Sequence, residues 1–97
     1  MTTDVATLTD RELGDALAVA LGWEYGQCPE AVSREGFWLV QEALNGREYG
    51  VFIFTYSSVS PSDVTVIKTQ PHDAKNHNIP RAVCEAAYQA LRREQDG

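Results

Sequence analysis

The residue types that bind metals or activate nucleophiles gather in one short stretch of this sequence. His72, Asp73 and His77 lie close together, and Cys84 follows seven residues after His77. A structural zinc site needs three or four ligands in tetrahedral geometry, and two histidines in a His-x4-His arrangement with one aspartate match no established spacing. A catalytic thiol must be exposed and have a lowered pKa, whereas the apolar neighbours of Cys84 predict a buried, inert one. We therefore expect Gln70–Asn78 to be a solvated polar loop without a metal.

Other catalytic patterns are equally weak. Asp10, Glu12 and Asp15 fall on one predicted exposed helical turn, where carboxylates stay solvated and lack the burial that acid–base catalysis needs. The glycines form no phosphate-binding loop between a strand and a helix, and the serines between residues 57 and 62 form no nucleophile elbow. The sequence predicts a protein that is not an enzyme and that needs no cofactor.

The net charge of the chain makes some classes of binding partner unfavourable. The chain has 14 acidic and eight basic residues, a net charge of −6, and its basic residues are scattered, which disfavours direct binding to nucleic acid. Residues 1–48 hold nine of the acids and three of the bases, so this half carries the whole net charge. Neither a signal peptide nor a membrane-spanning segment is recognisable, and Cys28 and Cys84 form no disulfide pattern. We expect a cytoplasmic protein with reduced thiols.

A predicted β-hairpin is the centre of the fold that must position these residues. Tyr49–Ser57 and Val64–Thr69 are rich in aromatic and β-branched residues, and Ser60–Asp63 forms the turn between them. The first run is apolar on both faces, so each face should be covered. Ninety-seven residues suffice for one domain, spanning 1–97, with one modest core.

Two helices have clear boundaries. Thr9 and Glu12 form a capping-box pattern at the start of the first helix, and Gly22 is a typical residue for its end. The last helix begins near Asn78, with Pro80 in its first turn. It presents an apolar stripe made by Val83, Ala86, Ala87, Ala90 and Leu91.

The segment Ser33–Leu44 is ambiguous between strand and helix. With a period of two it is a strand that enters a tight turn at Asn45–Gly46. With a period of 3.6 it is a helix, and Asn45–Gly46 becomes its left-handed C-terminal cap. The residue pattern favours neither alternative.

Three stretches resemble a known family: Glu12–Trp23, Gly36–Leu44 and Ile79–Leu91. In their order and their packing patterns they are similar to the small bacteriophage proteins grouped as the phage ABA sandwich domain. The resemblance implies that Ser33–Leu44 is a helix, which gives an α+β fold with a small antiparallel sheet packed by helices, in the order α-α-β-β-α; the alternative order is α-β-β-β-α. It further implies a phage protein in the bacterial host cytoplasm, and it supplies no catalytic residues.

We therefore expect a small phage accessory protein that acts by binding, as an inhibitor of a host protein with a basic surface. A nucleotide-binding or other small-molecule module and a structural protein of the virion are the alternatives. An edge strand such as Val64–Thr69 could also pair with another copy in a homodimer. The residues expected to contact the host partner are acids of the first half and two aromatic anchors: Asp10, Asp15, Trp23, Glu24, Tyr25, Glu30 and Glu35.

Overall fold

The computed structural model describes residues 5–22, 33, 36–55 and 59–96. Its elements, in chain order, are the 3-10 helix η1 (Val5–Thr7), α1 (Asp10–Leu21), α2 (Gly36–Gly46), β1 (Gly50–Phe54), β2 (Ser62–Ile67), β3 (Pro71–Asn76) and α3 (Ile79–Asp96). The α+β class and the predicted order of helices and hairpin are confirmed, with a third strand added before the last helix.

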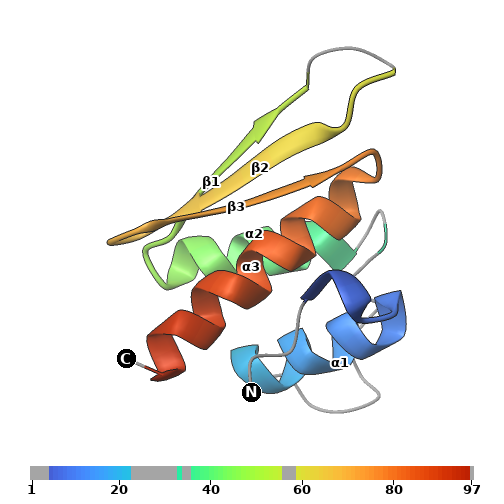
Figure 1. The fold of residues 1–97 in the computed structure, drawn as a ribbon. Helices are drawn as coiled ribbons and strands as arrows, with labels where there is room; N and C mark the ends of the chain where they lie inside the picture. Colours follow the sequence, from blue (N-terminus) through green and yellow to red (C-terminus); the bar gives the residue numbers. More distant parts are fainter. Residues whose placement is uncertain (1–4, 23–32, 34–35, 56–58, 97) are drawn as a thin grey trace.

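The described elements form three layers (Figure 1). The antiparallel sheet is one layer, with strand order β1-β2-β3. Helices α2 and α3 lie side by side against one face of it, α2 contacting β1 and α3 contacting β2 and β3. Helix α1 packs on α3 on the side away from the sheet. The last helix is therefore in the middle of the molecule.

The strand register assigns each side chain to a face of the sheet. Val51 lies opposite Val66 and Ile53 opposite Val64, and because opposed residues of an antiparallel pair share a face, these four face the helices. Phe52 and Phe54 alternate with them and face away. We call the face turned away from the helices the outer face. The described helices cover only the other face, so the expectation that both faces of β1 are covered is not met by these elements.

The core lies between the sheet and the helices. Its fully buried side chains come from every layer and include Leu13, Leu17, Val40, Leu44, Val64, Val66, Val83 and Leu91. The whole predicted stripe of α3 is buried. Small residues predominate among the buried apolar residues of this helix, which allows it to approach the sheet, α1 and α2 closely at the same time.

Helix ends follow local chemistry. The predicted capping box of α1 is present, with the Glu12 amide donating to Thr9 Oγ1 at 3.1 Å and the Thr9 amide donating to Glu12 Oε1 at 2.9 Å. Gly22 ends this helix in the left-handed region at φ 75°. Segment Gly36–Gly46 is a helix, which decides the ambiguity left by the residue pattern.

The predicted cap of α2 is wrong by two residues. The left-handed residue is Glu48, at φ 70°, rather than Asn45–Gly46. The Tyr49 amide donates to the Leu44 carbonyl at 2.9 Å and the Glu48 amide donates to the Asn45 carbonyl at 3.1 Å, the pairing of a Schellman motif. Tyr49 and Leu44 are both part of the buried core. Their burial determines where the turn falls, although this puts a glutamate in the left-handed region, which is strained for a residue with a side chain.

Two predictions about the sheet also need correction. The expected loop Gln70–Asn78 is largely strand β3, which pairs with β2 along its whole length. Strand β2 is consequently central, and the edges belong to β1 and β3, so Val64–Thr69 does not offer a free edge. Polar residues formed a strand here because β2 offers them hydrogen bonds, and sequence periodicity does not record that pairing.

Candidate functional site

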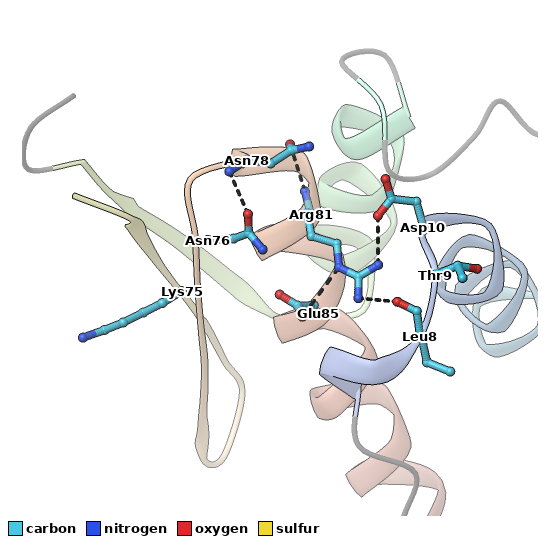
Figure 2. Close-up of a pocket in the computed structure, with 8 residues that line it drawn as sticks. All are labelled: Leu8, Thr9, Asp10, Lys75, Asn76, Asn78, Arg81 and Glu85. Carbon is cyan, nitrogen blue, oxygen red and sulfur yellow. Dashed lines mark hydrogen bonds and ion pairs between the residues drawn. The ribbon is translucent and has the colours of Figure 1, made fainter. Parts of the chain in front are cut away.

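A cleft of about 490 Å³ lies where η1, α1, β3 and α3 meet, and Arg81 is at its centre (Figure 2). The Arg81 Nη1 atom donates to Asp10 Oδ1 at 2.9 Å, and Nη2 donates to the carbonyls of Leu8 at 2.7 Å and Val5 at 3.1 Å. Its Nε atom lies 3.6 Å from Glu85 Oε1. The guanidinium fork thereby joins the first described residues to α3.

Two helix N-termini converge on this cleft. Thr9 caps α1, and Asn78 Oδ1 accepts from the Arg81 amide at 3.4 Å at the start of α3. Asn76 Oδ1 in turn accepts from the Asn78 amide at 2.9 Å. Lys75 lines the cleft, but its side chain extends away from Arg81 in Figure 2, and its Nζ atom lies 3.7 Å from Asp63.

The charges of the cleft neutralise one another. The side chain of Arg81 is only 10% exposed, and its contacts to Asp10, Glu85 and two carbonyls use its donors. Across the described residues, every buried side-chain nitrogen or oxygen has a hydrogen-bond partner. This arrangement fixes η1 and α1 against α3. The polar residues of the cleft therefore have a structural role.

Cys84 lies one residue from this network and is completely buried. Burial raises the pKa of its thiol to about 12; the positive charge of Arg81 opposes this shift, and the carboxylates of Asp10 and Glu85 add to it. A thiol in this state is protonated at neutral pH and is a poor nucleophile. The predicted burial of Cys84 is confirmed, and Cys28 lies outside the described residues.

The structure separates the histidines and aspartate that the sequence brings together. His72 pairs with Val66 on the face turned to the helices, and Asp73 is on the outer face, where its carboxylate accepts from Thr65 Oγ1 at 2.6 Å. His77 follows the end of β3 and is exposed. In the described ranges, no group of three or more His, Cys, Asp or Glu residues could hold a metal ion.

Two of the seven residues expected to bind a partner are described. Asp10 keeps 65% of its side chain exposed while it pairs with Arg81, and Asp15 is half-buried on α1. The neighbouring acid Glu12 is engaged in the capping box. The other five expected residues lie outside the described ranges: Trp23, Glu24, Tyr25, Glu30 and Glu35.

Sequence analysis missed the most exposed apolar surface of the sheet. On its outer face Phe52 is 50% exposed, Phe54 is 51% exposed and Ile67 is 38% exposed. The signal was present, because β1 is apolar with a period of two on both faces, but it was interpreted as a strand covered on both sides. The alternative interpretation is a strand with one face left for contact with another molecule.

This outer face has an apolar end and a polar end. Phe52 lies opposite Thr65, and Ile67 lies opposite Gly50. Phe54 lies opposite Asp63, which lies opposite Lys75 in the next strand. We name Phe52, Phe54 and Ile67 the outer apolar patch, and the carboxylates of Asp63 and Asp73 border it.

Comparison with known proteins adds no relative to these observations. No protein-family model matches the chain, and neither the curated proteins nor the solved structures include a match. The resemblance to the phage ABA sandwich domain therefore stays a prediction. None of the described helices combines the length and the apolar character needed to cross a membrane.

Proposed function

We propose that this protein acts by binding another protein through the outer face of its sheet. The observation that carries the proposal is the half-exposure of Phe52 and Phe54 on one face of an ordered strand. Phenylalanines two residues apart in a strand lie about 7 Å from each other on the same face, so their rings form one surface. Large aromatic side chains at such positions supply much of the energy of protein interfaces.

The composition of the patch and its border supports one kind of partner. An apolar centre bordered by polar groups is the usual anatomy of a protein interface. Asp63 and Asp73 border the patch on the side of β2 and β3, with Lys75 beside Asp63, and the chain has a net charge of −6. A partner with an apolar surface surrounded by lysine and arginine is complementary, and its association would be accelerated by electrostatic attraction.

The resemblance to phage proteins supports a biological setting for this binding. The protein is a phage accessory protein in the bacterial host cytoplasm, and its target is a basic host protein that it inhibits. Acids of the first half, Asp15 among them, contribute to attraction at long range. Catalysis forms no part of the proposal.

The test is a capture experiment from bacterial lysate with three tagged proteins: the wild type, the double variant Phe54→Ser with Ile67→Ser, and the control Val19→Ser. Val19 is the matched control because it is 70% exposed on α1, which packs on α3 on the side away from the sheet. We expect a host protein that the wild type and Val19→Ser retain, that the double variant loses, and whose affinity falls as salt rises.

Equal capture by the wild type and the double variant would refute the outer face as the contact. Affinity unchanged between low and high salt would refute the basic partner. A nucleotide or metabolite released on denaturation, with no protein captured, would favour the small-molecule module in place of this proposal.

A further inference from the structure

We propose that the free edge of β1 pairs with the same edge of a second copy, giving a two-fold antiparallel dimer with a continuous sheet. The order β1-β2-β3 makes β1 an edge strand, and within the described residues only β2 is bonded to it. Unpaired amides and carbonyls on such an edge are a template for another strand. This inference concerns the protein alone, and the dimer partly covers Phe52 and Phe54, whose half-exposure also carries the proposed function.

The two edges of the sheet differ in their protection. Strand β3 carries Pro71, Asp73 and Lys75, and proline and charged residues are the devices that keep an edge from pairing with other chains. Strand β1 has the sequence Gly-Val-Phe-Ile-Phe and carries neither a charge nor a proline. The chain protects one edge and leaves the other suited to pairing.

Strand β1 is complementary to itself about Phe52. With the two-fold axis at Phe52, Val51 lies opposite the second copy's Ile53, and Gly50 lies opposite the second copy's Phe54. The alternation of faces is preserved, so apolar residues meet apolar residues on both sides of the joined sheet.

Gly50 has a specific place in this pairing. A Cβ atom there would lie 3.2 Å from Cε2 of Phe52, so the Phe52 ring already leans over the glycine. In the dimer the second copy's Phe54 would lie beside that ring, which is the aromatic contact by which an edge glycine is covered. Ile53 is 37% exposed although it faces the helices, and the added strand would shield it as well.

Charge also favours a second copy at this edge. Two chains of net charge −6 repel each other, and β1 contributes no charge to that repulsion. Arg47 and Glu48 precede β1, and at its other end Asp63 lies opposite Phe54, with the Lys75 Nζ atom 3.7 Å from the Asp63 carboxylate. Antiparallel pairing about Phe52 holds the two Glu48 residues eight strand positions apart, about 27 Å, which is well beyond the screening length of about 8 Å in physiological salt.

The area sets the strength of the dimer. A phenylalanine can bury 150–250 Å², so two half-exposed rings offer on the order of 200 Å² per copy. Even with the flanking residues, the interface stays near or below the roughly 1,200 Å² of stable complexes. We expect a reversible dimer with a dissociation constant in the micromolar range.

Charge-swap variants provide the test, read by sedimentation equilibrium of the purified full chain from micromolar to millimolar concentration. Phe52→Lys and Phe52→Glu each place two like charges on the two-fold axis, and each should weaken dimerisation at least tenfold. An equimolar mixture places opposite charges there and should restore the dimer. Circular dichroism is the check that both variants are folded.

Cross-linking gives a second readout that needs no charged variant. In a Cys28→Ser background, Phe52→Cys should form an interchain disulfide under mild oxidation, because residues opposed at the axis are within disulfide reach. The control Val19→Cys should not, although Val19 on α1 is 70% exposed and Phe52 is 50% exposed. Cys84 is buried and does not interfere.

Three results would each overturn the dimer: a wild type that stays monomeric at all concentrations, a dimer that Phe52→Lys leaves intact, or a Lys and Glu mixture that does not associate. All three are measured without lysate. Loss of the dimer with retained capture of a host protein would leave the proposed function standing, and the reverse result would remove that function alone.

Discussion

Replacing Arg81 with methionine is expected to destabilise the fold more than any other substitution of a charged residue in the cleft. Methionine keeps much of the aliphatic volume and removes the guanidinium. The change breaks the ion pair with Asp10 and two hydrogen bonds to the carbonyls of Val5 and Leu8. It also removes the cation nearest to Glu85, whose side chain is 9% exposed.

The magnitude follows from burial. The pair with Asp10 contributes below about 1 kcal/mol, because the Asp10 side chain is mostly exposed and solvent screens it. Removing one partner of a buried pair costs about 3–5 kcal/mol. The 3.6 Å separation from Glu85, together with a further interaction of that residue, places the loss at about 3 kcal/mol. For a chain of this length the melting temperature should fall by about 12–24 °C.

Urea denaturation followed by circular dichroism measures this loss. Asp10→Asn should cost below about 1 kcal/mol, and Arg93→Met, an exposed change on the same helix, should lie within about 0.5 kcal/mol of the wild type. Adding Glu85→Gln to Arg81→Met should recover about 1 kcal/mol or more, because it removes the uncompensated charge. The reasoning fails if Arg81→Met costs no more than Asp10→Asn, or if Glu85→Gln destabilises it further.

Four further predictions concern local features. Thr9→Ala should cost about 1 kcal/mol in urea denaturation by removing the cap of α1. Hydrogen bonds from the Thr9 amide and hydroxyl lower the pKa of Glu12, so stability from its ionised carboxylate is present above the ordinary carboxyl pKa and lost as pH falls through the lowered one; a melting curve against pH, compared with Glu12→Gln, measures this. Because the pKa of Cys84 is raised, the stability contributed by its protonated thiol should be complete below the unfolded thiol pKa and lost as pH rises towards about 12. Labelling of this thiol should occur only when the protein unfolds. Glu48→Gly should stabilise by about 1 kcal/mol in thermal unfolding, because it removes side-chain strain at a positive φ.

Each of these has a result that contradicts it. If Thr9→Ala unfolds with the free energy of the wild type, the cap does not stabilise the protein. A Glu12→Gln profile parallel to that of the wild type through the acid range would show no linkage. Fast labelling of Cys84 in the folded state, in a Cys28→Ser background, would contradict its burial. A destabilised Glu48→Gly would mean that the glutamate side chain contributes more than its backbone costs.

Local signals in the sequence predicted local structure well. The capping box at Thr9, the glycine at 22 and the start of α3 near Asn78 each involve partners within a few residues, and all three are confirmed. The apolar stripe of α3 is confirmed because a period of 3.6 requires no knowledge of what packs against it.

The features that sequence analysis missed depend on distant partners. Strand β3 has little intrinsic preference for a strand and forms because β2 lies beside it. Arg81 and Asp10 are 71 residues apart, so no local pattern connects them. Glu48 takes the left-handed position because burial of Leu44 and Tyr49 determines where the turn falls. The outer apolar patch has a sequence signal, but only the layer order reveals which face of β1 is uncovered.

The central position of α3 has a consequence for the order in which the fold can be assembled during synthesis. This helix contacts β2, β3, α1, α2 and η1 (Figure 1), and all of these precede it in the chain. Until its residues emerge from the ribosome, the sheet has only α2 against it, and the side of α1 that will meet α3 is exposed. The nascent chain must therefore keep its core open until α3 has been synthesised, and until then it is vulnerable to proteases and to pairing between neighbouring chains through β1.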